Sequence, residues 1–306
     1  MTTAGPVGAT TRSRPRRRLS KDARSAVIFL LPASIGLIVF YLIPAIRGLY
    51  FSFTEYAVLT PAKWTGLDNY ARLVHDPLFW NALKMTVYYV VLNIGFQTII
   101  AVLLAVLMQR LTNSVLLRGM ALLPYFVANV IIALVWYFMM DYQIGVVNVG
   151  LDGLGLDRVA FFGESAWAIP TVAFINVWRH MGYTALLVFA GLQTINRSVY
   201  EAADMDGAGE GRKFFSITLP LLRPVLAMVL VVTVTGSFQI FDTIAVTTKG
   251  GPINATRVIY YYIWDLAFGQ LDFGYASALA MVLFLLLLGV SLIQLRLMRA
   301  GESDEM

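Results

Sequence analysis

The chain has 306 residues, 58% of them hydrophobic and 13% charged, and its formal net charge is +5. Soluble domains carry about 25% charged residues, so this composition excludes an ordinary water-soluble domain and fits a surface that faces lipid. The sequence has no cysteine, which excludes disulfides and thiol catalysis, and its two histidines, His75 and His180, lack metal-ligand spacing.

The beginning of the chain differs from the rest. Residues 1–25 are polar and rich in Arg, Thr, Ser and Pro, which predicts a disordered basic head. Its arginines favour contact with anionic lipid over a nucleic-acid-binding arm, and we expect no nucleic-acid partner. The apolar run that follows continues through Phe51, whereas a signal peptide has an apolar region of about 7–15 residues and a cleavage site. It is therefore predicted to be a membrane span.

Long apolar segments dominate the remainder. A helix of roughly 20 residues crosses a hydrocarbon core about 30 Å thick, and a helix pairs all its backbone groups internally. A continuous apolar run such as residues 282–288 does not fit the alternating pattern of a β-barrel. The sequence predicts an all-α, polytopic membrane protein. Its six expected transmembrane helices cover residues 27–50, 83–108, 119–140, 166–191, 222–241 and 276–297.

The distribution of Lys and Arg predicts the orientation. These residues accumulate in the head, in the loops after the second and fourth spans, and near the C-terminus. Residues 301–306 are expected to form a cytoplasmic tail. Lys and Arg are enriched on the cytoplasmic side of membrane proteins. Both termini are therefore predicted to lie in the cytoplasm.

Polar residues recur at helical spacing inside three of the expected spans. Polar groups in lipid are costly and usually face a cavity or a partner, so these residues are candidates for a path that hydrogen-bonds a polar solute. Contacts between helices are the alternative, and Arg179 has the further alternative of pairing with an acid on a partner subunit. Gln239 and Asp242 are the strongest single candidates. The full set is Asn93 and Gln97, then Asn176, Arg179, His180 and Tyr183, then Thr235, Gln239 and Asp242.

A polar loop over residues 198–220 follows the fourth span. Ser198 and Glu201 have the spacing of a capping box, which predicts that a helix starts there. Gly207 is a suitable C-terminal stop. The helix between them, near 12 Å long, is too short to be stable alone, and a second short helix is expected over residues 210–216. These features alone also fit an ordinary capped connector.

The loop also carries a longer motif. It reads Glu201-Ala202-Ala203, three residues, Gly207, nine residues, and Ile217-x-Leu219-Pro220. This pattern resembles the EAA loop of binding-protein-dependent ABC importer permeases. The stretches 64–70, 238–252 and 274–278 resemble the carbohydrate-type branch of that family. The resemblance covers roughly residues 25–300, which we treat as one permease domain over residues 26–300.

The resemblance implies a fold and a role. The fold is the six-helix type I ABC importer permease, in the plasma membrane of a prokaryote. The helix that carries Glu201, Ala202 and Ala203 would be a coupling helix, which docks on a separate dimer of ATP-binding subunits. This chain has no nucleotide-binding motif, so it is expected to be a transport subunit, not an enzyme. The residues implied in coupling are Glu201, Ala202, Ala203, Asp206 and Gly207.

The resemblance also implies further partners and a substrate class. A second, related permease would complete the path, and an extracytoplasmic solute-binding protein would dock on loops 52–81 and 242–275. The expected substrate is a sugar or related polyol, with no cofactor. Another solute remains the alternative, such as glycerol-3-phosphate, a polyamine or phosphate, although Arg179 is the only basic residue deep in a span. A self-sufficient secondary transporter would need inverted repeats, and an intramembrane enzyme would need converging acid, base or metal groups.

Overall fold

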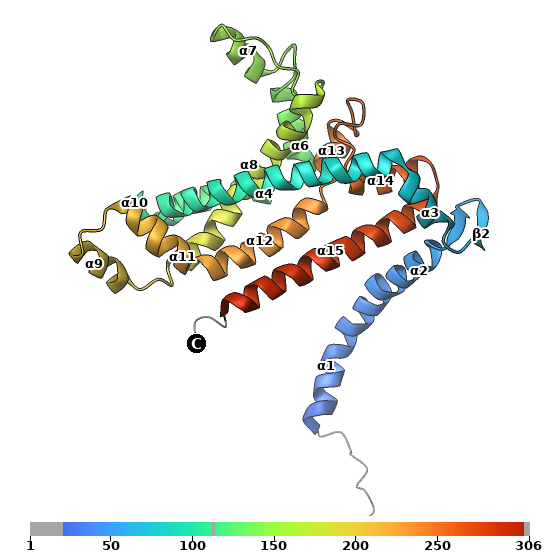
Figure 1. Cartoon of the computed structure of the whole chain (residues 1–306), viewed down its shortest axis with the longest axis horizontal. Helices are drawn as coiled ribbons and strands as arrows, with labels where there is room; N and C mark the ends of the chain where they lie inside the picture. Colours follow the sequence, from blue (N-terminus) through green and yellow to red (C-terminus); the bar gives the residue numbers. More distant parts are fainter. Residues whose placement is uncertain (1–20, 112–113, 303–306) are drawn as a thin grey trace, which may run out of the picture. The chain divides into compact units, whose positions relative to one another are not determined.

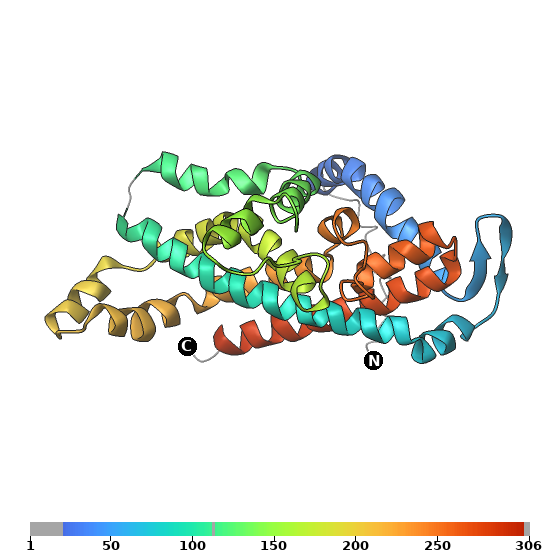
Figure 2. The ribbon, with the colours of Figure 1, turned by 90° about the horizontal axis from the view of Figure 1, so that it is seen from above.

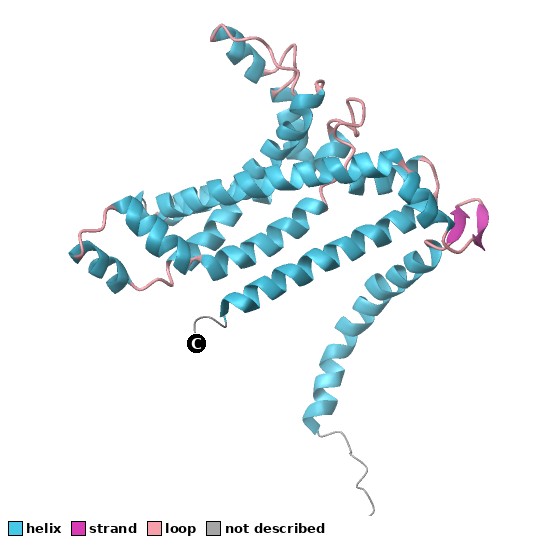
Figure 3. Cartoon of the chain, in the orientation of Figure 1, coloured by secondary structure: helices cyan, strands magenta, loops and turns pink. Residues whose placement is uncertain are grey.

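The computed structural model describes residues 21–111 and 114–302, which form helices joined by short loops and one small hairpin (Figure 3). The predicted helical membrane architecture is confirmed. The chain divides into two compact units, residues 1–48 and 49–306.

The first unit is a long apolar helix. It consists of α1 (Lys21–Leu37), a π-helical turn η1 (Ile38–Leu42) and the start of α2 (Ile43–Phe51). The helix begins inside the range 1–25 assigned to the head, and residues 1–20 lie outside the described residues. The span Ile28–Phe51 buries none of its most apolar window within this chain. Such a helix is suited to a lipid environment.

In the second unit, four long helices run side by side (Figures 1 and 2). Small residues let helices of this unit approach closely: Ala101 and Ala105 are fully buried, and a Cβ on Gly182 would collide with the carbonyl oxygen of Ala121, which lies on a further, shorter helix. Tyr89 and Tyr275 are among the fully buried residues of the main apolar core. The four helices are α4 (Pro77–Leu111), α8 (Ser165–Leu192), α12 (Arg223–Phe238) and α15 (Phe273–Glu302).

Short elements gather at the two ends of these helices (Figure 1). At the end we call the α9 end lie α9 (Arg197–Met205), α10 (Glu210–Lys213), η2 (Phe214–Thr218) and α11 (Leu219–Leu221). At the opposite end, the α3 end, lie β1 (Thr54–Ala57), β2 (Thr60–Trp64), α3 (Asp68–His75), α14 (Ile259–Trp264) and η3 (Asp265–Gly269). The antiparallel hairpin β1–β2 was not anticipated in an all-α reading.

The expected third span is broken in the structure. Residues 119–140 fall on two helices, α5 (Val115–Phe126) and α6 (Asn129–Met139), which are bent by 90° at a short break. Val127 and Ala128 both leave the helical conformation, with ψ angles of 139° and 135°. At 12 residues, α5 is about 18 Å long, so it does not cross the hydrocarbon core by itself. After the break, α6 leads to α7 (Val146–Gly153).

The other expected spans have counterparts in the structure. Within the described residues, four helices are long and apolar enough to cross a membrane, and the bent α5–α6 pair adds a fifth segment. The expected span 166–191 is α8, 28 residues long, whose course through the bundle includes Arg179 and His180. The fifth span is interrupted, because α12 ends at Phe238 and α13 (Asp242–Val246) begins after a break at Phe241, where φ is −141°.

Candidate functional site

The helix that carries the Glu-Ala-Ala motif begins two residues earlier than predicted. Asn196 is the N-cap of α9, and its side-chain oxygen accepts a hydrogen bond from the backbone N–H of Ser198 at 3.1 Å. The predicted capping box is therefore wrong. Asn is a strong N-cap, and Asn196 caps the helix in place of Ser198. The Glu201 carboxylate therefore pairs with Arg197 at 3.1 Å and not with a backbone N–H group.

The predicted end of this helix is confirmed. Gly207 has φ of +70°, a conformation that favours glycine. The backbone N–H of Ala208 donates to the carbonyl of Ala203 at 2.9 Å, and that of Gly207 donates to the carbonyl of Asp204 at 3.0 Å. These two bonds form a Schellman motif, which fixes the direction in which the chain leaves α9.

The two alanines of the motif lie on different faces of α9. Ala203 is buried within the chain, with 7% of its surface exposed. Glu201, Ala202 and Asp206 are exposed. Met205 is 89% exposed and was missed by sequence reasoning. The spacing shared by Ser198, Glu201, Ala202 and Met205 places them on one exposed stripe, which we call the outer stripe.

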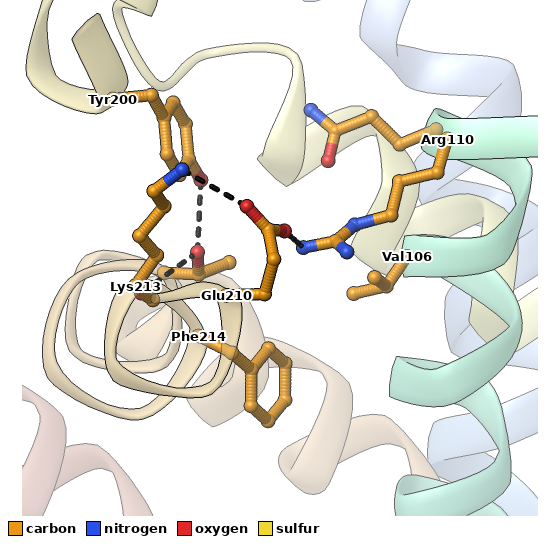
Figure 4. Close-up of a pocket in the computed structure, with 8 residues that line it drawn as sticks. Val106, Arg110, Tyr200, Glu210, Lys213 and Phe214 are labelled. Atoms are coloured by element: carbon orange, nitrogen blue, oxygen red, sulfur yellow. Dashed lines mark hydrogen bonds and ion pairs between the residues drawn. The ribbon is translucent and has the colours of Figure 1, made fainter. Parts of the chain in front are cut away.

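Four charged side chains connect this segment to α4, and Figure 4 shows three of them, Arg110, Glu210 and Lys213. Arg110, near the C-terminus of α4, contacts Glu210 at 2.5 Å, and Glu210 accepts a hydrogen bond from Lys213 at 2.9 Å. Lys213 also contacts Asp204 of α9. The hydrogen bond from Lys213 and the charge of Arg110 lower the pKa of Glu210 below its usual value. The expected second helix is present as α10, and its helical course continues through η2.

Polar side chains from α4, α8 and α12 line a pocket of about 210 Å³ in the bundle. The pocket brings together Asn93 and Gln97 with Asn176, His180 and Tyr183, all predicted from helical spacing. It also includes Thr184, Thr233 and Ser237, which were missed. Thr233 and Ser237 lie one turn apart on α12, and this spacing was the available signal.

Hydrogen bonds across three helices organise the pocket. The Asn93 side-chain amide donates to Ser237 Oγ at 2.8 Å and to Gln97 Oε1 at 3.2 Å. Gln97 Nε2 donates to Thr184 Oγ1 at 2.8 Å. Asn93 Oδ1 is buried and has no hydrogen-bond partner among the described residues. Because a buried acceptor without a partner is costly, this oxygen would gain a hydrogen bond from a hydroxyl that reaches it when the neighbouring side chains move.

Aromatic rings cover another part of the pocket wall. Tyr125 and Tyr183 stack with ring centroids 4.6 Å apart and planes within 10°. His180 Nδ1–H donates to the carbonyl of Asn176 at 2.9 Å, and its Nε2 accepts from Arg179 at 2.9 Å. The pocket thus combines amide and hydroxyl groups with apolar ring faces. Among the described residues, no group of three or more His, Asp or Glu side chains could hold a metal ion.

Arg179 and Asp242 do not line this pocket. The Arg179 guanidinium donates to the carbonyl oxygens of Tyr125 at 3.1 Å and Val127 at 3.3 Å, where α5 ends. Asp242 accepts a hydrogen bond from Asn129 at 3.2 Å, where α6 begins. Both residues therefore hold the break between α5 and α6.

Thr235 and Gln239 also lie outside the pocket lining. Thr235 Oγ1 donates to the carbonyl of Val231 on its own helix at 2.9 Å, and Gln239 is exposed. The predicted shared face with Asp242 is wrong, because Asp242 begins α13 after the chain has left the helix.

A second polar cluster lies at the α3 end. The hydroxyls of Tyr262 and Tyr275 donate to Asp76 Oδ2 at 2.6 and 2.7 Å. Arg72 pairs with Asp272 at 2.7 Å and lies over the Tyr275 ring. Burial raises the pKa of Asp76, but hydrogen bonds from the two tyrosines and from backbone N–H groups outweigh it, so this pKa lies below its ordinary value.

Comparison with known proteins identifies the family. Residues 97–299 match the family described as the binding-protein-dependent transport system inner membrane component. The chain belongs to this family. It is similar to the sulfoquinovosyl glycerol transport system permease protein SmoG of Agrobacterium fabrum strain C58, with 37% identity over 92% of each chain. It is also similar to the trehalose/maltose transport system permease protein MalF of Thermococcus litoralis, with 32% identity over 91% of this chain and 95% of the relative.

A solved structure supports the same assignment. A bacterial ABC transporter involved in the import of the acidic polysaccharide alginate contains a chain that matches this one with a TM-score of 0.82. The sequence identity is 26%, and the match covers 92% of this chain and 96% of that chain. The predicted ABC importer permease architecture is confirmed. The chain is a multi-pass membrane protein and a transport subunit.

Proposed function

We propose that this permease forms part of the path for a neutral, hydroxyl-rich solute such as a sugar, and that the pocket around Asn93 contacts it. The unpartnered Asn93 Oδ1, beside amide and hydroxyl groups, is the observation that carries the proposal. The stacked Tyr125 and Tyr183 rings suit the C–H faces of a sugar. The relatives named for trehalose and maltose and for sulfoquinovosyl glycerol support a carbohydrate-like substrate.

The charge of the pocket favours a neutral solute over a phosphorylated one. Arg179 is the nearby cation, and its guanidinium is engaged by the carbonyls of Tyr125 and Val127 and by His180. An anionic group in a low-dielectric site needs a compensating charge. The second permease of the complex would supply the rest of the path.

We also propose that a separate ATPase dimer hydrolyses ATP and binds α9. The outer stripe of α9 is exposed at one end of the bundle, and its apolar Met205 next to acidic Glu201 offers a mixed contact surface. The Lys and Arg residues of the loops after the second and fourth expected spans favour a cytoplasmic position for this end, and we infer that both termini lie on the same side of the membrane. The opposite end would then receive the solute-binding protein.

Uptake by cells that lack the native gene and carry a variant tests the substrate proposal. Asn93→Ala removes the acceptor Oδ1, worth about 0.5–1.5 kcal/mol, together with the amide group that donates to Ser237 and Gln97, so the KM for uptake should rise by about 2- to 12-fold or more. Thr235→Ala is the matched control, because this hydroxyl bonds to its own helix outside the pocket.

The panel of solutes should contain neutral disaccharides, a sugar phosphate and a polyamine. We expect uptake of a neutral sugar, with an effect of Asn93→Ala and none of Thr235→Ala. Uptake of only the phosphate or the polyamine would refute the substrate class. Equal KM values in Asn93→Ala and wild type would remove this pocket from the path.

A further inference from the structure

The coupling segment is tied to a helix that is distant from it in sequence. The loop that contains α9 and α10 is flanked in the chain by α8 and α12. Arg110 belongs to α4, a hundred positions before Glu210, and yet the two side chains are 2.5 Å apart. Figure 4 shows Glu210 between Arg110 on one side and Lys213 on the other.

The contact continues into α9. Lys213 contacts both Glu210 and Asp204, and only 12% of its side chain is exposed. Beside it, Tyr200 of α9 shares a hydrogen bond with Thr218 of η2 at 3.0 Å. A displacement of α9 is therefore transferred to α10, and through Glu210 to Arg110. We call Arg110, Asp204, Glu210 and Lys213 the ionic link.

The helix at the far side of this link reaches the polar pocket. With 35 residues, α4 is about 52 Å long. Arg110 lies 13 positions from Gln97, which corresponds to about 20 Å along the helix axis. Gln97 and Asn93 hold α8 and α12 through Thr184 and Ser237. A shift of α4 relative to these helices alters the hydrogen bonds that line the pocket.

We propose that Arg110 is a positioning residue that transmits movement of the coupling segment directly to α4 and thereby to the pocket. This inference rests on the proposed function of α9 as the ATPase contact. In this arrangement, movement of the ATPase reaches α8 and α12 through the backbone that joins them to the α9–α10 loop. It reaches α4 through the ionic link.

Because the side chains of the ionic link are partly exposed, its role in coupling can be tested apart from the folding stability of the permease. The side chains of Arg110 and Glu210 are 49% and 62% exposed, and exposed ion pairs contribute little to folding. Their loss therefore leaves the permease folded and acts on the transfer of motion. An ion pair at the surface also breaks and reforms easily, which suits a joint that moves in every transport cycle.

The experiment uses the complete importer complex in proteoliposomes and measures solute transported per ATP hydrolysed. Arg110→Glu places two carboxylates together, and we expect the ATP hydrolysed per solute to rise at least about fivefold, the lower range of measured couplings between sites. Arg110→Gln should act in the same direction with a smaller effect. The reversed pair, Arg110→Glu with Glu210→Arg, should recover at least half of the lost coupling.

A nearby cation provides the control. Arg212 lies in α10, is exposed, and forms no ion pair within the described part of the chain. Arg212→Glu changes the charge equally and should keep wild-type coupling. The thermal stability of every variant is measured in parallel and should stay near that of wild type.

The outcomes separate this inference from the proposed function. If wild-type complexes contain no ATPase on α9, the proposed function fails. If wild type is coupled and Arg110→Glu is equally coupled, the proposal for Arg110 fails while the function stands. Uncoupling that the reversed pair does not recover, or that Arg212→Glu reproduces, also overturns the pairing of Arg110 with Glu210.

Discussion

Arg179 is a cation inside the bundle whose hydrogen bonds have a structural use. A broken helix leaves its last carbonyl groups without intrahelical partners, and in a membrane interior water is not there to replace them. The Arg179 guanidinium reaches the carbonyl oxygens of Tyr125 and Val127 across from α8. It therefore fixes the end of α5 and, next to it, Tyr125 in the pocket wall.

Replacement of Arg179 should lower the stability of the protein and leave its substrate class unchanged. Arg179→Gln leaves the two carbonyls without charged donors, and we expect a loss of about 1.5 kcal/mol, the lower limit for hydrogen bonds to charged groups, because the side chain is partly exposed. Arg179→Lys should recover part of the loss, since an ammonium group lacks the fork of donors. Thermal melting in detergent measures both. Equal melting temperatures for wild type and Arg179→Gln would contradict the capping role.

Asp76 predicts a dependence of stability on pH. Its pKa in the folded protein lies below the ordinary value of 3.8, mainly through hydrogen bonds from Tyr262 and Tyr275 that oppose the effect of burial. The stabilisation is complete above pH 3.8 and is lost as pH falls through the lower, folded pKa. Melting temperatures of wild type should thus fall more steeply below pH 3.8 than those of Asp76→Asn.

The comparison for Asp76 is Asp157→Asn, which removes an exposed carboxylate in a different loop. This variant should retain the steep decline of wild type at acid pH. Identical pH profiles for Asp76→Asn and wild type would show that the two tyrosine hydroxyls do not favour the charged carboxylate.

The two faces of α9 make the coupling helix testable as an element. The chain has no native cysteine, so a single introduced thiol reports one position. Met205→Cys lies on the outer stripe and Ala203→Cys on the buried face, where the exposed fractions are 89% and 7%. A maleimide should label Met205→Cys at least about tenfold faster in the isolated permease, because thiol reactivity depends on access.

Assembly with the ATPase should remove this difference. Met205→Cys should become protected in the complex, whereas Ala203→Cys stays slow in both states. Undiminished labelling of Met205→Cys in an active complex would exclude the outer stripe from the contact. Rapid labelling of Ala203→Cys in the isolated permease would contradict the burial of that face.

At the scale of elements, sequence predicted what depends on local chemistry. Gly207 ends α9 because its left-handed conformation is a property of that residue. Pairs one turn apart, such as Asn93 and Gln97, share a face on any straight helix. The break at Val127 was missed because it depends on Arg179, more than fifty positions away. The face of Asp242 was wrong because the chain leaves the helix at Phe241.

The start of α9 shows a different limit. Ser198 and Glu201 fit a capping box, but Asn196 is an equally strong cap two positions earlier. Local spacing does not decide between the two when both side chains are available. The helix therefore begins two residues earlier than the capping-box spacing predicted.

At the scale of the molecule, the mechanism depends on which end of the bundle faces the cytoplasm. The ionic link and α9 lie at one end, and the hairpin β1–β2 lies at the other (Figure 1). An ATPase has access to ATP on the cytoplasmic side, so the α9 end must be there if α9 transmits its motion. The enrichment of Lys and Arg in the loops after the second and fourth expected spans supports that orientation.

Cysteines at the two ends test the orientation in living cells. Leu59 is 89% exposed between β1 and β2, and Leu59→Cys should react with a membrane-impermeant maleimide applied to spheroplasts. Met205→Cys should be unreactive until the membrane is opened. Because both thiols are exposed in the folded chain, a difference between them reports the side of the membrane and not burial. Labelling of Met205→Cys from outside would place α9 beyond the reach of any cytoplasmic ATPase, and both the coupling role and the ionic link would have to be abandoned.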